Sequence, residues 1–237
     1  MKLAFSNKKY WKTVSASQII GENSIPSAEF FGNVSHGSTV LDIGCGNGAM
    51  AEFVSKKGFN VVGLDINEEA ISKNRKRKTN VQFVVGDITK RLPFERGTFD
   101  AVLLSFVLVN IISMKEREKL ASEITRILKP RGIVWLNEAL VSKDYEERYS
   151  FSKPFLENNH DFFVFKKGIL ASSFKKKEDI DVAVKEGHIV RLSHHFTIEE
   201  LKKIFRGYRV IDKKLSFTQS LNTGSKVEMI TIVFEKK

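Results

Sequence analysis

The sequence has few of the residues that support several common classes of protein. Its one cysteine, Cys45, allows neither an intramolecular disulfide nor a zinc site built from cysteines, and we predict no metal site. No apolar run approaches the roughly 20 residues that span a bilayer. The N-terminal stretch MKLAFSNKKYWK lacks the long apolar segment of a signal peptide. We therefore expect a cytoplasmic protein without membrane contact.

Acidic residues are fewer than basic residues. The 237-residue chain carries 39 Lys and Arg against 28 Asp and Glu, a formal net charge of +11. The excess is spread along the chain and forms no basic tail. Such a balance is compatible with nucleic acid or with an acidic small substrate, and it does not distinguish them. The chain length suits a single large domain.

Apolar runs alternate with helix-like segments over the first 140 residues. In the helix-like segment at 114–128, Leu120, Ile124 and Ile127 keep a helical period. This alternation predicts βαβ units around a parallel sheet. The five runs are TVLDIG at 39–44, FNVVGLDI at 59–66, VQFVVGDI at 81–88, FDAVLLSFVLV at 99–109 and GIVWLNEAL at 132–140.

Residues 144–192 break the pattern. They show no clean strand alternation and are rich in aromatic residues, which predicts a cap or lid inserted after the fifth strand. Tyr145 and Tyr149 are its candidate substrate contacts, although a small hydrophobic cluster that holds the cap is an equally good interpretation. Thr197 and Glu200 then predict a capping box, and two apolar runs around NTGS predict a C-terminal hairpin.

The stretch VLDIGCGNG at 40–48 is typical of a loop that lets a ligand approach the backbone at a helix N-terminus. Gly44, Gly46 and Ala49 also satisfy the dinucleotide fingerprint, with Asp65 where that fold keeps its ribose carboxylate. The loop alone is therefore compatible with NAD, and an NAD-dependent dehydrogenase or a non-catalytic nucleotide-binding module remain alternatives.

The ends of the following strands favour a different cofactor. Asp65, Asp87 and Ser105 end the second, third and fourth predicted strands, where an open α/β sheet binds its ligand. Asp65 suits two vicinal ribose hydroxyls, and Asp87 suits an exocyclic adenine amine. Asp42, beside the loop, favours a cationic ligand with an ammonium and a sulfonium. Together these residues describe S-adenosylmethionine better than NAD.

Four motifs occur in the order found in the class I S-adenosylmethionine-dependent methyltransferases, which the sequence resembles. They are VLDIGCGNG at 40–48, VVGLDIN at 61–67, FVVGDITKRLPFERGTFDAVLLSFVLVNI at 83–111 and LKPRGIVWLNE at 128–138. The resemblance implies a Rossmann-like, doubly wound, seven-stranded and mainly parallel sheet with an antiparallel C-terminal strand. We also predict an N-terminal helical segment over residues 1–35, and the resemblance implies S-adenosylhomocysteine as product.

The resemblance implies roles for individual residues. Gly44, Cys45 and Gly46 would line the methionine part through their backbone. Asp65 would hold the ribose. The remaining implied contacts are Ile66 on adenine, Asp87 and the Ile88 backbone at the adenine edge, Ser105 and Phe106 near the reacting sulfur, and Tyr10 and Trp11 closing over the cofactor.

The sequence indicates the molecule that accepts the methyl group less directly than it indicates the cofactor. The fourth strand ends in LSFV and lacks the Asn/Asp-Pro-Pro-aromatic sequence common in methyltransferases that act on base amines. Methyl transfer mainly needs alignment and sometimes a base, for which His194 and His195 are candidates. We expect an enzyme that methylates an O or N atom of a small molecule. RNA, including tRNA, is the alternative acceptor because of the net charge.

Overall fold

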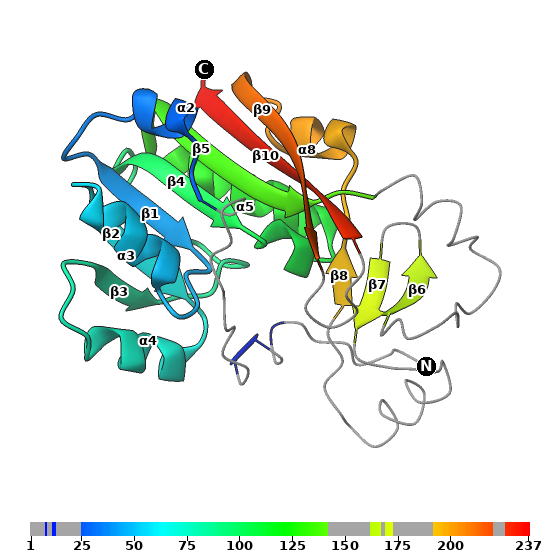
Figure 1. Ribbon diagram of the computed structural model, residues 1–237, viewed down its shortest axis with the longest axis horizontal. Helices are drawn as coiled ribbons and strands as arrows, with labels where there is room; N and C mark the ends of the chain where they lie inside the picture. The colour runs from blue at the N-terminus through cyan, green and yellow to red at the C-terminus, as the bar shows by residue number, and fades with distance from the viewer. Residues whose placement is uncertain are drawn as a thin grey trace.

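The computed structural model describes residues 8, 11–12, 25–141, 162–166, 169–172, 192–219 and 226–237. Its centre is a seven-stranded sheet with the order β3-β2-β1-β4-β5-β10-β9 (Figure 1). β10 runs antiparallel to both of its neighbours, whereas β1 to β5 are parallel. This confirms the predicted fold class. The strands are β1 (Thr39–Ile43), β2 (Asn60–Asp65), β3 (Gln82–Val85), β4 (Phe99–Ser105), β5 (Leu128–Ala139), β9 (Tyr208–Gln219) and β10 (Lys226–Lys236).

Helices cover both faces of the sheet. On one face lie α2 (Ala28–Gly32), α3 (Ala49–Lys56) and α4 (Glu68–Arg75), whose apolar residues form one core with Val40, Val61 and Trp135. On the other lie α5 (Met114–Ile127) and α8 (Ile198–Ile204), whose core includes Leu41 and Leu136. Alternate residues of each strand thus enter opposite cores, which is why the strands read as continuous apolar runs.

The helix starts follow the local sequence. Asn67 accepts a hydrogen bond from the Ala70 N–H at 2.9 Å and caps α4, directly after β2. Thr197 and Glu200 form the predicted capping box of α8. Such caps fix where the chain leaves a strand and enters a helix, and they place the ends of the strands for the site described below.

The apolar run from Phe99 to Val109 does not form one strand. β4 ends at Ser105, and Phe106 adopts a left-handed φ of 54° while its N–H donates to the Asn137 carbonyl at 2.9 Å. The chain then forms the short 3-10 helix η2 (Leu108–Asn110). Apolar side chains continue after the strand because η2 is itself buried.

Residues 144–192 contain strands that the sequence analysis missed. β6 (Phe162–Lys166) and β7 (Ile169–Ser172) pair antiparallel, and β7 pairs with β8 (Leu192–His194). The segment shows no clean strand alternation, and β6 and β7 form in it nonetheless. The cap itself stays a prediction, and Tyr145 and Tyr149 lie outside the described residues. In Figure 1 the small sheet lies beyond the carboxyl end of β5.

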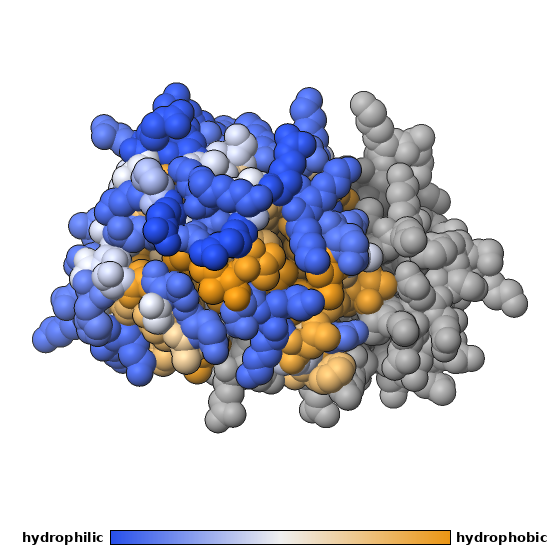
Figure 2. Space-filling model, turned by 90° about the horizontal axis from the view of Figure 1, so that it is seen from above, coloured by the Kyte–Doolittle hydropathy of each residue, from blue (hydrophilic) through white to orange (hydrophobic). Residues whose placement is uncertain are grey.

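Most of the face seen in Figure 2 is hydrophilic. Figure 2 shows charged and polar residues around an apolar area on one face. Among the described residues, no helix has the length and apolar character needed to cross a membrane. Of the predicted N-terminal helical segment, Lys8, Trp11 and Lys12 are helical, as is α2, while Tyr10 lies outside the described residues.

Candidate functional site

The glycine loop is tied to the end of β2. The N–H groups of Gly44 and Cys45 donate to the Leu64 carbonyl at 2.7 and 3.0 Å, and the Gly46 N–H donates to Oδ2 of Asp65 at 2.8 Å. Gly44 has a φ of +71°, and a Cβ there would lie 3.0 Å from Cγ2 of Val107. Glycine is needed at this position for its backbone conformation and for the close approach of the segment after β4.

Asp65 organises this edge of the sheet. Its Oδ1 accepts from the Asn67 N–H at 2.9 Å, so its two oxygens bind the glycine loop and the start of α4. An ionised carboxylate has about four acceptor sites, so Asp65 can still accept two hydroxyl protons. This geometry is compatible with the predicted ribose contact.

Asp42 is a buried carboxyl group beneath the loop. It is 2% exposed, and its Oδ2 has no hydrogen-bond partner among the described residues. Burial, and then the neighbouring charge of Asp65, raise the pKa of Asp42 to about 8. A buried acidic oxygen without a partner, beside a second carboxylate, fits a cationic ligand. A positive charge would offset both the cost of burying Asp42 as a carboxylate and its repulsion by Asp65. The residues present therefore fit S-adenosylmethionine.

Asp87 already has partners in this structure. Its Oδ1 accepts from the N–H and the hydroxyl of Thr89 at 3.0 and 2.8 Å, and its Oδ2 forms an ion pair with Lys8. Burial opposes ionisation, but the bonds from Lys8 and Thr89 outweigh it and hold the pKa of Asp87 below its usual range. Asp87 follows β3 by two residues, close to the predicted strand end.

The N-terminal segment reaches the same edge at a second point. The Nδ2 of Asn67 donates to the carbonyl of Trp11 at 3.2 Å. Lys8 and Trp11 thus contact the chain after β3 and after β2, respectively. Trp11 was predicted at the cofactor from the resemblance, whereas no motif distinguishes Lys8 from the other lysines.

The other predicted cofactor residues lie at the carboxyl edge or behind it. Ser105 is buried and ends β4, and Phe106 follows it in its left-handed conformation. Ile66 is half-buried after β2, and Ile88 packs against the core near the end of β3. Cys45 is 1% exposed, and burial raises the pKa of its thiol, so its side chain is a packing residue.

His194 and His195 are both 7% exposed and lie at the same edge. Three ionisable residues near them were not predicted as site residues: Arg117, Glu138 and Glu200. Of these, Glu138 left a signal, since it is an acid inside the otherwise apolar run GIVWLNEAL. The described residues contain no group of three or more His, Cys, Asp or Glu that could hold a metal ion.

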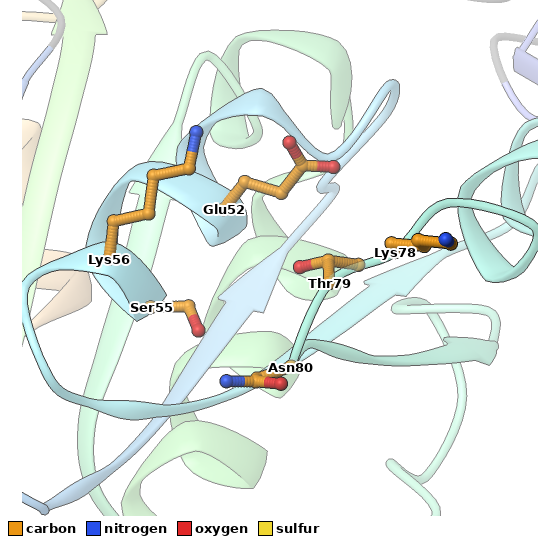
Figure 3. Close-up of a pocket in the computed structure, with 6 residues that line it drawn as sticks. All are labelled: Glu52, Ser55, Lys56, Lys78, Thr79 and Asn80. Carbon is orange, nitrogen blue, oxygen red and sulfur yellow. The ribbon is translucent and has the colours of Figure 1, made fainter.

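A polar hollow of about 540 Å³ lies elsewhere. Figure 3 shows its lining: Glu52, Ser55 and Lys56 from α3, and Lys78, Thr79 and Asn80 from the connection before β3. The end of α3 and the start of β3 both belong to the amino edge of the sheet. This hollow is therefore distinct from the edge that carries Asp65 and Asp87.

Comparison with known protein families supports S-adenosylmethionine as the cofactor. The model of a methyltransferase domain matches residues 41–136. A demethylmenaquinone methyltransferase from Renibacterium salmoninarum is 36% identical over 40% of this chain and 39% of its own length. A sterol 24-C-methyltransferase from Schizosaccharomyces pombe is 35% identical over 60% of this chain and 38% of its own. The chain spans about two fifths of the length of these curated relatives.

Solved structures share the fold over more of the chain. A methyltransferase dependent on S-adenosylmethionine from Methanosarcina mazei has a TM-score of 0.70 at 23% identity, covering 90% of this chain and 98% of that one. The 1,6-didemethyltoxoflavin N1-methyltransferase from Burkholderia thailandensis, solved with its substrate and S-adenosylhomocysteine, has a TM-score of 0.55 at 16% identity, covering 85% and 72%.

Proposed function

We propose that this chain, which belongs to the class I S-adenosylmethionine-dependent methyltransferases, transfers a methyl group to an O or N atom of a small molecule. The observation that carries the proposal is the arrangement of Asp42, Asp65 and Asp87 on β1, at the end of β2 and just after β3. Asp65 holds that loop through the Gly46 N–H, and Asp42 contributes a buried and uncompensated acidic oxygen. The bound cofactor supplies an activated methyl group on a sulfonium.

The chain's own residues then bind the cofactor and orient its methyl group. Asp65 accepts the ribose hydroxyls while it keeps the loop and the start of α4 together. Asp42 offsets positive charge from below the loop. Asp87, Ile88 and Ile66 form the adenine side. Alignment of the methyl group with an acceptor at the carboxyl ends of β4 and β5 is the main contribution that such a reaction asks of a protein.

A small-molecule acceptor is supported by the named activities of the relatives, which act on demethylmenaquinone and on a sterol. The name of the sterol enzyme places the transferred methyl group on a carbon. Transfer to an O or N atom is therefore a prediction for this chain that is not taken from that relative. The net charge of +11 favours RNA as the second candidate.

Calorimetry with S-adenosylhomocysteine and with NADH tests the cofactor. We expect the homocysteine ligand to bind and Asp65→Asn to weaken it at least about tenfold, because hydrogen bonds to a charged acceptor contribute about 1.5–3 kcal/mol each. Asp212→Asn, on the distant strand β9, is the matched control and should bind like the wild type. Binding of NADH alone, or an unchanged affinity in Asp65→Asn, would refute the assignment.

Label transfer tests the acceptor. Methyl-labelled S-adenosylmethionine is incubated with the protein and an extract of the source cell, and the nuclease-sensitive and small-molecule fractions are counted. We expect label in small molecules. Label in nucleic acid, with binding that falls steeply as salt is added, would instead support RNA, since such binding releases counterions.

A further inference from the structure

The two buried histidines occupy a defined place beside β5. β4 pairs with β5 up to Ser105 and Asn137, and β5 continues beyond that point. Phe196 pairs with this remaining edge: its N–H donates to the Ala139 carbonyl at 3.0 Å, and its own carbonyl accepts from the Val141 N–H at 2.9 Å. Because Phe196 is anchored there, His194 and His195 lie at the carboxyl ends of β4 and β5, where an α/β sheet of this kind binds ligands.

His194 is paired with an acid. Its Nε2 lies 3.4 Å from Oε1 of Glu200, a contact longer than a typical hydrogen bond. The other oxygen of Glu200, Oε2, accepts from the Thr197 N–H at 2.8 Å within the capping box. The contact with His194 lowers the pKa of Glu200 to about 2, so that carboxyl group is ionised. The first turn of α8 thus fixes the carboxylate that faces the imidazole.

This pairing selects one tautomer of the imidazole. A carboxylate at Nε2 favours the form in which Nε2 carries the proton, and Nδ1 is then a proton acceptor. Both ring nitrogens are buried without a hydrogen bond to a described residue, but only Nε2 has a carboxylate beside it, so Nδ1 is the nitrogen available to a ligand. The His194 ring packs edge-on against Phe196, with ring centroids 4.7 Å apart. A buried acceptor atom without a partner is costly unless another group, such as a ligand, supplies the proton.

Arg117 connects this pair to a further buried acid, Glu138. Arg117 on α5 lies over the Phe196 ring, donates to the Ile111 and Ile112 carbonyls, and faces both Glu200 and Glu138. Glu138 on β5 is fully buried and accepts from the N–H groups of Leu108 and Val109. These contacts hold η2, which follows Ser105 and Phe106, against β5 and the histidine segment.

We propose that His194, positioned by Glu200, is the catalytic proton acceptor of the methyl transfer, and that the acceptor substrate carries an O–H or N–H on the atom that is methylated. This inference rests on the proposed function. The acceptor's electron pair forms the new bond to the methyl carbon, the bond from that carbon to sulfur breaks with its electron pair passing to sulfur, and the acceptor's proton passes to Nδ1 of His194.

The label-transfer assay tests the roles with matched variants. We expect His194→Gln to lower the rate of transfer about 100-fold or more, the usual contribution of a general base, with S-adenosylhomocysteine affinity within about twofold of the wild type. His36→Gln, an exposed histidine before β1, should leave the rate unchanged. Glu200→Gln should lower the rate about tenfold and shift its pH dependence.

Thr197→Ala separates positioning from capping. It removes the hydroxyl that caps α8 but leaves the carboxylate of Glu200 beside His194. If Glu200 acts through His194, Thr197→Ala lowers the melting temperature and keeps the rate. Equal losses of rate in Thr197→Ala and Glu200→Gln would overturn the positioning role, and a His194→Gln rate within about threefold of the wild type would overturn the catalytic role.

Imidazole nitrogen NMR on the wild-type chain, labelled with ¹⁵N-histidine and assigned with the His194→Gln variant, gives a readout independent of turnover. We expect His194 to carry its proton on Nε2. A proton on Nδ1 would overturn the proposal. Wild-type protein that binds the homocysteine ligand but labels no fraction of the extract would instead refute the proposed function itself, which is a distinguishable outcome.

Discussion

The ion pair between Lys8 and Asp87 makes a sharp prediction about cofactor binding. If Asp87 accepts the exocyclic amine of adenine, the ligand meets a carboxylate whose Oδ1 already accepts two hydrogen bonds from Thr89 and whose Oδ2 is paired with Lys8. The ligand must then displace the ammonium group or share Oδ2 with it. Replacing Lys8 by Met removes this competition and keeps a side chain of similar length.

The size of the effect follows from the exposure of the two side chains, which is 44% for Lys8 and 15% for Asp87. Half-exposed ion pairs contribute about 0.2–1 kcal/mol. Lys8→Met should therefore tighten S-adenosylhomocysteine binding about two- to fivefold. The gain should shrink as the sodium chloride concentration rises, because added salt weakens the competing pair in the wild type.

Isothermal titration calorimetry at low and at physiological salt measures both effects. Lys12→Met is the matched control, since it removes the same charge four residues further along the chain, and it should leave the affinity unchanged. Weaker binding by Lys8→Met would mean that Lys8 closes the segment onto a bound cofactor. An unchanged affinity would mean that Asp87 does not contact the ligand. Either result would refute the argument.

Two further predictions concern the buried parts of the site. Asp42 has a pKa raised to about 8, above its ordinary value of 3.8, so its ionisation disfavours the folded state. The free energy of unfolding should therefore fall between about pH 4 and 8, by at most roughly 1.4 kcal/mol per pH unit. Asp42→Asn should reduce the fall in melting temperature between pH 5 and pH 8; an unaltered fall would contradict the burial argument. Gly44→Ala should cost about 1–3 kcal/mol in denaturant unfolding and weaken ligand binding, because it adds both left-handed strain and a contact with Val107. Gly37→Ala, with a φ of +80° and open space around it, is the control for strain alone, and equal losses would refute the contact.

Much of the fold could be predicted because it is encoded in local patterns. The apolar runs gave the parallel strands, and the Thr197 and Glu200 pair gave the start of α8. The end of β4 could not be read in this way. Ser105 ends the strand because Phe106 turns away while bonded to Asn137, a contact made across the sheet, and the buried 3-10 helix that follows is as apolar as a strand.

The candidate site divides along the same line. Asp42, Asp65 and Asp87 are visible in the sequence because each stands at or near a strand end, and parallel strands bring such ends together. Lys8 and Glu200 act at the same edge from segments far away along the chain, and only the folded chain shows what they contact. The contact of Glu200 with His194 could not be predicted from the sequence, because the capping box already accounts for an acid at this position.

The buried acids share a physical logic that connects stability to the proposed chemistry. Burial raises the pKa of Asp42 and of Glu138 to about 8, so each acid opposes folding as the pH rises toward neutrality. Glu138 recovers part of that cost through the N–H groups of Leu108 and Val109. Asp42 has an oxygen that no described residue satisfies. A cationic cofactor would supply the missing compensation, so we expect its binding to release a proton below about pH 8 and to stabilise the fold.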